Sequence, residues 1–305
     1  MGKKLGHFRY GFKAMGSPCE LQGFVATREQ GETVATQIAT EVERLEQRYS
    51  RYRPNSLLSE INRVAATGSE IEVDSETAGL LDYAATCYQQ SDGLFDVTSG
   101  VLRRAWRFDH GALPDQSQID ELLKTVGWDK LRWNSHRLSF TLPGMEIDLG
   151  GVVKEYAADR AATVCESAGL SSAIVNLGGD IRIVGPRPDG KPWVVGLQHP
   201  RKKDELLQNM EIYQGGLATS GDYERCIMVG GERYSHILNP RTGWPVKHLA
   251  TVSVVGDFCL IAGSASTIAM LKEEEGPRWL ESLGLPHIWM DASGQIGGSW
   301  PEQVA

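Results

Sequence analysis

The sequence lacks an apolar segment long enough to cross a membrane. No run approaches the roughly 18 apolar residues of a transmembrane helix, and the least charged long segment, 258–271, carries three hydroxyl side chains and is expected to form a buried helix. The basic N-terminus is not followed by an apolar stretch, so no signal peptide is visible. We therefore expect no integral membrane segment and a cytoplasmic location for the chain as given, or a periplasmic one if it is a trimmed mature form.

Cysteines are also few, and basic residues are outnumbered by acidic ones. The five cysteines are scattered, odd in number and never in CxxC spacing, so they specify neither a zinc site nor a disulfide framework. Lys and Arg number 31 against 39 Asp and Glu, which gives a formal net charge of −8. This balance argues against a nucleic-acid partner, because nucleic acid requires a basic face. It leaves room for one local cationic pocket.

Glycine is abundant, and helical and strand patterns both recur along the chain. The 34 glycines, often paired, predict many tight turns or close approaches of the backbone to a ligand. Apolar spacing predicts helices over 34–49, 75–90, 152–168 and 258–271, the last capped by Asp257, and a strand end at Met145–Asp148. Hairpins alternate with strand–helix–strand units, which favours an α+β fold with mixed, largely antiparallel sheets flanked by helices. We expect residues 1–305 to form a single unit with two lobes and a ligand cleft between the regions 50–110 and 148–271.

Two glycine pairs follow apolar segments. In Asp148-Leu-Gly-Gly-Val-Val-Lys154, a strand end, a glycine turn and a helix start would bring backbone N–H groups and the positive helix end into one corner that can hold a phosphate. Lys154 could add a charge and Asp148 could accept from a ligand donor, although an ordinary strand–helix turn explains the same residues. Asn176-Leu-Gly-Gly-Asp180 is open to the same two interpretations, with Asp180 as the cap of a turn.

A histidine and an aromatic residue supply the other candidates. His236 lies at the end of a predicted hairpin, and the turn 219–222, which carries small hydroxyl side chains, lies at a neighbouring hairpin end. His236 is either a general base near neutral pH or a structural residue. No GxSxG elbow accompanies Ser220, which argues against a serine hydrolase. Phe95, beside Asp96 in a turn, either flanks a planar ligand or plugs the core.

In combination, these segments resemble the ApbE family of FAD:protein FMN transferases. The matching segments run in order along nearly the whole chain: Ala14-Met-Gly-Ser-Pro18, Tyr49-Ser-Arg-Tyr-Arg-Pro-Asn-Ser56, Asp92-Gly-Leu-Phe-Asp-Val-Thr98, 148–159, Asn176-Leu-Gly-Gly-Asp180, Ala218-Thr-Ser-Gly-Asp-Tyr223 and 235–243. The resemblance implies that the protein binds FAD and moves the FMN half to a Ser or Thr hydroxyl of an acceptor flavoprotein, with release of AMP and assistance from Mg²⁺. The acceptor is expected to carry an Asp-x-x-[Ser/Thr]-Gly-Ala-[Ser/Thr] motif.

The family pattern also assigns residues. It places FAD contacts at Met15, Tyr52, Leu94, Phe95, Asp96, Asp148, Lys154 and Leu238. It places His236 as the base for the incoming hydroxyl, and the metal at the backbone carbonyl of Gly151 and the side chains of Ser266 and Thr267.

The sequence departs from the family pattern at two positions close to these residues, 263 and 155. The late helix usually carries an Asp four residues before the Thr, on the same helix face, but here Gly263 stands at the Asp position and only Thr267 remains. Glu155 replaces a usual glycine after Lys154 and could serve the helix dipole or lie near the phosphates. Because Mg²⁺ favours carboxylate and water oxygens, three outcomes are open. Water and Ser266 complete a weaker site, a carboxylate such as Asp222 or Asp180 substitutes, or metal-dependent transfer is lost.

These departures keep two rival functions in view. One is an FAD pyrophosphatase, in which water replaces the acceptor hydroxyl and the products are FMN and AMP. The other is a non-catalytic FAD-binding homologue that lost the metal together with the Asp at position 263.

Overall fold

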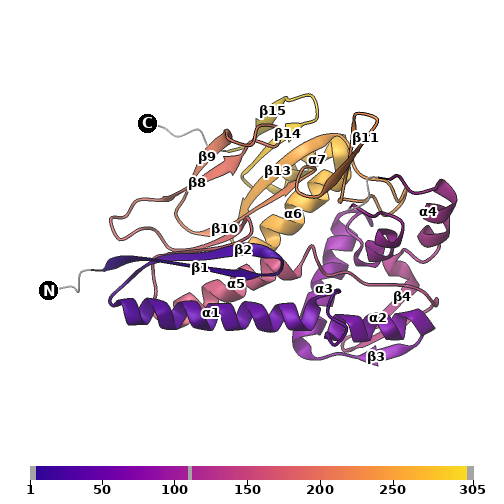
Figure 1. The fold of residues 1–305 in the computed structure, drawn as a ribbon, viewed down its shortest axis with the longest axis horizontal. Helices are drawn as coiled ribbons and strands as arrows, with labels where there is room; N and C mark the ends of the chain where they lie inside the picture. Colours follow the sequence, from indigo (N-terminus) through magenta and orange to yellow (C-terminus); the bar gives the residue numbers. More distant parts are fainter. Residues whose placement is uncertain (1–4, 109–111, 301–305) are drawn as a thin grey trace.

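An eight-stranded antiparallel sheet forms the centre of the molecule (Figure 1). The computed structural model describes residues 5–108 and 112–300. The strand order is β1-β2-β6-β7-β10-β13-β14-β15, and these strands are β1 (Gly6–Ala14), β2 (Ser17–Val25), β6 (Ala173–Leu177), β7 (Asp180–Val184), β10 (Gly215–Gly221), β13 (Leu249–Gly256), β14 (His287–Asp291) and β15 (Ile296–Gly298).

Helices cover one face of this sheet and a hairpin covers the other. The covering helices are α1 (Arg28–Tyr49), α5 (Val153–Ser167) and α6 (Cys259–Lys272), followed by η3 (Glu273–Glu275) and α7 (Gly276–Leu283), which packs on α6. On the opposite face, β8 (Trp193–Gln198) and β9 (Leu206–Ile212) pack Trp193 and Met210 against Ile183 and Leu217 of the large sheet. None of the helices in the described ranges is long and apolar enough to cross a lipid bilayer.

A smaller group of elements lies at one end of the sheet, at the lower right of Figure 1. Its helices are α2 (Leu57–Thr67), α3 (Ser75–Gln90), η1 (Val97–Arg104), α4 (Gln116–Leu123) and η2 (Trp128–Lys130). A three-stranded sheet of order β3-β5-β4 completes it, with β3 (Glu70–Glu72), β4 (Leu131–Asn134) and β5 (Arg137–Phe140). A separate hairpin consists of β11 (Cys226–Val229) and β12 (Glu232–Ser235).

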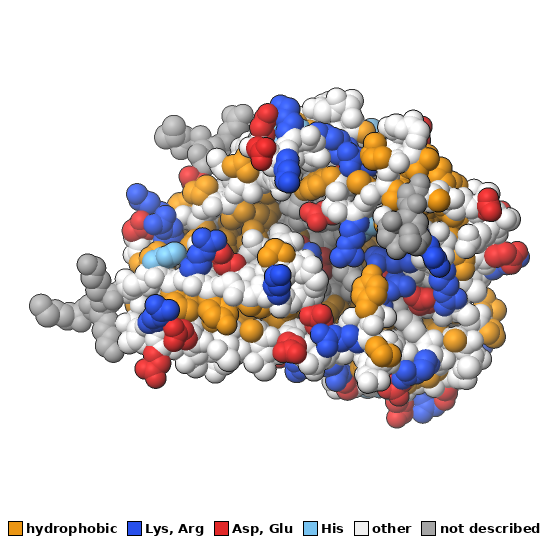
Figure 2. All heavy atoms as spheres, in the orientation of Figure 1, with side chains coloured by type: hydrophobic (Ala, Val, Ile, Leu, Met, Phe, Trp, Pro, Cys, Tyr) orange, Lys and Arg blue, Asp and Glu red, His pale blue; other side chains and the backbone are white. Residues whose placement is uncertain are grey.

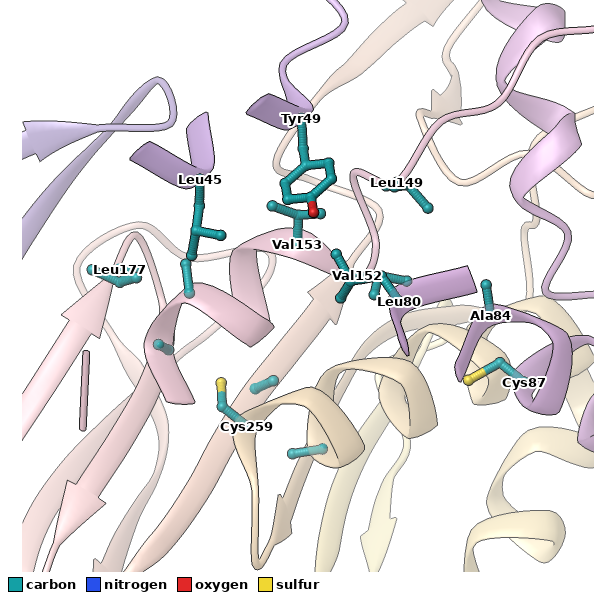
Figure 3. Packing of buried hydrophobic residues seen from close by; sticks show 14 of the residues in the cluster. Leu45, Tyr49, Leu80, Ala84, Cys87, Leu149, Val152, Val153, Leu177 and Cys259 are labelled. Atoms are coloured by element: carbon teal, nitrogen blue, oxygen red, sulfur yellow. The ribbon is translucent and has the colours of Figure 1, made fainter. Parts of the chain in front are cut away.

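The start of α5 is packed into the core where α1, α3 and α6 meet (Figure 3). Leu149 and Val152 are almost fully buried there, beside Tyr49 of α1 and Leu80 of α3. The periodic apolar face of α1, which the sequence predicts, supplies one wall of this junction. The packing therefore fixes the glycine pair 150–151, which lies between Leu149 and Val152.

The α+β prediction with largely antiparallel sheets is confirmed, as are the four helices. Three of them start within about one residue of the predicted position, whereas the first starts earlier than predicted, at Arg28. The strand predicted at Met145–Asp148 is wrong, because this segment bonds to a side chain and to a helix end and not to a strand. Ile147 exchanges hydrogen bonds of 2.8 and 2.9 Å with the side-chain amide of Asn62, and the Asp148 N–H donates to the carbonyl of Val97 at 2.8 Å.

The cap predicted for α6 is also wrong. Its N-cap residue is Phe258, which makes no side-chain cap bond. The backbone N–H groups of Cys259 and Leu260 instead donate to the two carboxylate oxygens of Asp159 on α5, each at 2.9 Å. Asp159 also forms an ion pair of 3.0 Å with Arg182 of β7. A carboxylate distant in sequence thus ties α6 to α5 and to the sheet.

We expect Asp159→Ala to lower the free energy of unfolding by about 3 kcal/mol, because it uncaps α6 and leaves Arg182 buried without its partner. Both side chains of the pair are only 13% exposed. Urea unfolding followed by circular dichroism measures the change. Glu166→Ala, at an exposed position of the same helix, is the control and should change stability by less than about 0.5 kcal/mol. Equal stability of the two variants would contradict the role of Asp159.

Candidate active site

The turn before α5 has open backbone groups and an aromatic wall. Val152 is the N-cap residue of α5 and makes no side-chain cap bond. In the described backbone hydrogen bonds at this end, the carbonyls of Leu149 and Val152 are acceptors and the carbonyl of Gly151 is not. A Cβ atom placed on Gly151 would lie 3.6 Å from the ring of Phe95. Among the described residues, the carbonyls of Gly150 and Gly151 thus accept no backbone hydrogen bond, and the first turn of α5 offers N–H groups and these carbonyls beside a flat apolar ring.

Lys154 brings a second glycine turn and the first hairpin to the same place. Its Nζ lies 2.7 Å from a carboxylate oxygen of Asp180 and 3.5 Å from the carbonyl of Gly178. Gly178 has a φ of 63°, and a Cβ atom on it would lie 2.5 Å from Ser17, so the β6–β7 turn packs directly on the β1–β2 turn. Burial alone would lower the pKa of Lys154, but Asp180 and Glu155 outweigh it and raise that pKa, so the ammonium stays charged.

Met15 and Tyr52 are the predicted FAD contacts with the most distinctive conformations. Met15 lies in the β1–β2 turn with a φ of 51°, and its N–H donates to Glu46 at 2.7 Å. A positive φ is uncommon for a residue with a side chain. Tyr52 is 74% exposed, and its hydroxyl accepts a bond of 3.4 Å from Arg103. The Tyr52 ring is therefore free to contact a ligand.

Asp148 is held by arginines that the motif analysis did not single out. Arg51 lies 2.8 Å and Arg103 3.5 Å from one of its carboxylate oxygens, while the N–H of Gly150 donates to the other at 2.9 Å. Burial would raise the pKa of Asp148, but Arg103 and Arg51 lower it below the ordinary value. The carboxylate is thus ionised, and it fixes the glycine turn.

Leu94 and Asp96 support the turn that carries Phe95. Leu94 is half-buried against the main core. The carboxylate of Asp96 accepts from the N–H and hydroxyl of Thr98 at 2.8 and 2.7 Å and from the N–H of Trp128 at 3.0 Å. Burial raises the pKa of Asp96 in spite of these bonds. The structure shows a capping role for Asp96, and its contact with FAD stays a prediction.

His236 is half-buried in a positively charged environment. Burial lowers its pKa to about 4, and the charges of Arg103, Arg225 and Lys154 add to the effect. Its Nδ1 is buried and has no hydrogen-bond partner in the described part of the chain. The imidazole is therefore neutral at pH 7 and able to accept a proton. Figure 2 shows Lys and Arg side chains gathered beside a hollow near the middle of the visible face.

Leu238 is placed differently from the other candidates. It packs in the cluster of Trp106, Ile119 and Tyr234 and forms an isolated β-bridge with Pro245. Among the other candidates, Arg103 bonds Tyr52 and, with Lys154, lowers the pKa of His236, and Phe95 lies beside Gly151.

Two of the predicted metal residues, Ser266 and Thr267, lie on α6, and the third, Gly151, lies just before α5. The Ser220 hydroxyl is hydrogen-bonded to Ser266 at 2.8 Å and to Thr267 at 3.0 Å, and Ser266 also donates to the carbonyl of Gly263 at 2.9 Å. Ser220 thus joins these two hydroxyls, a role that the sequence pattern around it does not predict. The Glu155 side chain fills the space beside Gly263, and burial together with Asp180 raises its pKa to about 8.

These groups fit a magnesium ion by the type of donor, because Mg²⁺ takes oxygen ligands. Within residues 5–108 and 112–300, no group of three or more His, Cys, Asp or Glu side chains forms a metal cluster. The two substitutes considered from the sequence are already paired: Asp222 with Arg201 through two bonds of 2.6 Å, and Asp180 with Lys154.

The chain matches known proteins over most of its length. The family model described as "ApbE family" matches residues 15–289. A protein of Vibrio cholerae named "FAD:protein FMN transferase" is 32% identical over 264 residues, which cover 83% of this chain and 78% of that protein. A protein of Escherichia coli K12 with the same name is 30% identical over 274 residues, covering 86% of this chain and 78% of that protein.

Solved structures agree with this match. The ApbE protein of Thermotoga maritima superposes with a TM-score of 0.88 at 28% identity, covering 96% of this chain and 97% of that one. The flavin transferase ApbE of Vibrio cholerae superposes with a TM-score of 0.86 at 26% identity, covering 97% of each chain. The protein therefore belongs to the ApbE family.

Proposed function

We propose that this protein is an FAD:protein FMN transferase, which moves FMN from FAD to a Ser or Thr hydroxyl of another protein and releases AMP. The observation that carries the proposal is the charged Lys154 in the first turn of α5, held by Asp180 at 2.7 Å, together with a neutral His236 whose pKa the Lys154 charge helps to lower. The curated relatives with this name support it, because they align with this chain over most of its length.

Binding of FAD is assigned to the groups around the glycine turn. The N–H groups of the first turn of α5 and the ammonium of Lys154 suit the pyrophosphate. The exposed ring of Tyr52 suits a flat part of the substrate, and contact with the ring of Phe95, which is only 6% exposed in the main core, stays a prediction. Met15, Leu94, Asp96, Asp148 and Leu238 complete the proposed contacts, with Asp148 holding the turn through its bond to Gly150.

Transfer requires one bond to phosphorus to form and one to break. The acceptor hydroxyl oxygen bonds to the phosphorus of the FMN half, and the bond from that phosphorus to the bridging oxygen of the AMP half breaks. His236 takes the proton of the hydroxyl, for which its neutral imidazole is suited. Gly151, Ser266 and Thr267 would hold a Mg²⁺ ion, which when bound supplies charge neutralisation at the phosphate oxygens.

The acceptor is proposed to be a flavoprotein domain with the Asp-x-x-[Ser/Thr]-Gly-Ala-[Ser/Thr] motif. Incubation of the protein with FAD, MgCl₂ and such a domain should release AMP and leave one covalently bound flavin on the domain. Release should depend on both the domain and the metal, with EDTA as the metal-free control. FMN and AMP formed without acceptor would identify a pyrophosphatase instead. FAD bound without any AMP release would identify a non-catalytic flavin-binding protein.

We expect Tyr52→Ala to weaken FAD binding about fivefold, since a lost aromatic stacking contact costs on the order of 1 kcal/mol. Tyr52→Phe should bind FAD like the wild type if the ring stacks. Quenching of flavin fluorescence measures the dissociation constant. Tyr213→Ala is the matched control, because Tyr213 is a tyrosine of similar exposure, 55% against 74%, in the turn after β9. Unchanged FAD affinity in Tyr52→Ala would remove this residue from the site.

The lowered pKa of His236 predicts that the free energy of unfolding depends on pH. Because the pKa of His236 is about 4 in the folded protein, against an ordinary value of 6.5, the unfolded chain binds more protons between these values. Its contribution to stability is therefore present above about pH 6.5 and is lost as the pH falls toward 4. His236→Gln should flatten this part of the stability profile and lower the transfer rate at least 100-fold. NMR titration of the imidazole gives the pKa directly. A full transfer rate in the variant would make His236 structural.

A further inference from the structure

Glu155 occupies the space that a side chain at position 263 would need. A Cβ atom placed on Gly263 would lie 2.4 Å from Cγ and 2.9 Å from Oε1 of Glu155. Carbon atoms without a bond between them do not approach so closely, so only glycine fits at position 263 while Glu155 keeps its place. The carboxyl group of Glu155 thus lies where a side chain from α6 would otherwise project.

The pairing of the two helices shows what else lies near this carboxyl group. Asp159 of α5 meets Cys259 of α6, and Glu155, one turn earlier in α5, meets Gly263, one turn later in α6. The helices are therefore antiparallel along this contact. One further turn in the same direction reaches Gly151 before α5 and Thr267 in α6.

Helix side chains lean toward the N-terminus of their own helix. On α5 this inclines the Glu155 carboxyl group toward Gly151, and on α6 it inclines Thr267 toward Gly263. From these directions we expect the Glu155 carboxyl group, the Gly151 carbonyl and the Thr267 hydroxyl to face one region between the helices. Ser220 holds the hydroxyl of Thr267 from the sheet side at 3.0 Å.

Glu155 also differs from the neighbouring carboxylates in its partners. Its Oε2 atom is buried and has no hydrogen-bond partner among the described residues, although the residue is only 7% exposed. Asp159 accepts two backbone N–H groups and pairs with Arg182, and Asp180 pairs with Lys154. A buried carboxylate oxygen without a partner is costly, and a cation would satisfy it.

We propose that Glu155 is the carboxylate ligand of the magnesium ion, and that it acts from α5 in place of the missing side chain at position 263. This inference rests on the magnesium dependence put forward under the proposed function. Mg²⁺ is commonly held by one or two carboxylates together with substrate phosphates and water, so a single glutamate with the Gly151 carbonyl and the Thr267 hydroxyl is sufficient.

Binding of Mn²⁺, followed by the loss of the EPR signal of the free ion, tests this directly, and Mg²⁺ competition confirms that the site is shared. Titrations are made with and without FAD. Glu155→Gln keeps the shape of the side chain but removes its charge, and should weaken Mn²⁺ binding at least tenfold. Glu166→Gln, on an exposed position of the same helix, should bind like the wild type.

The reciprocal exchange gives the sharper result. Glu155→Gly alone should bind Mn²⁺ as weakly as Glu155→Gln, and the double variant Glu155→Gly with Gly263→Asp should return to within about threefold of the wild type. Thermal unfolding establishes whether each variant is folded. If the double variant is not folded, the Mn²⁺ affinity of Glu155→Gln alone decides whether Glu155 is a metal ligand. Wild-type Mn²⁺ affinity in Glu155→Gln, with and without FAD, would overturn the assignment. If Mn²⁺ binding depends on Glu155 but no AMP is released, the proposed transferase function is refuted and the assignment of Glu155 as a metal ligand stands.

Discussion

The bonds from Asp159 to the first two N–H groups of α6 fix the geometry on which the site depends. The same carboxylate pairs with Arg182 of β7, so one side chain joins α5, α6 and the large sheet. With Cys259 held at Asp159, the residues one and two turns along α6 are placed opposite Glu155 and Gly151. The positions of Gly263 and Thr267 therefore follow from an interaction that itself lies outside the site.

The sequence predicts what is encoded locally and misses what depends on distant partners. The helix 34–49 follows from apolar spacing, and the structure extends it to Arg28. Capping rules consider adjacent residues and therefore predict Asp257 as the cap of α6, whereas the capping carboxylate comes from a residue 100 positions away. Motifs likewise identified Lys154 and His236, but not the pairing of Arg51 with Asp148, since no local pattern relates residues 97 positions apart.

The positive charges near His236 act both on the bound substrate and on the histidine itself. Lys154 and Arg103 favour an anionic substrate, and together with burial they also lower the pKa of His236. A base with a pKa of about 4 is weak. A pyrophosphate bound beside these cations would offset their effect, because a nearby negative charge raises the pKa of an imidazole. His236 would thus become a stronger base when the substrate is present, in a protein whose overall charge of −8 gives no indication of this local field.

The contact between Glu155 and Gly263 constrains which residues can stand at these two positions. Glycine within a helix costs about 1 kcal/mol relative to alanine, yet here it is the residue that leaves room for the glutamate. Glu155 lies in the first turn of α5, where the helix dipole favours a negative charge but burial and Asp180 raise the pKa to about 8. A side chain added at position 263 alone would overpack the contact, and a glycine at position 155 alone would remove the carboxylate. The two positions are therefore energetically coupled, and each residue is explained only by the other.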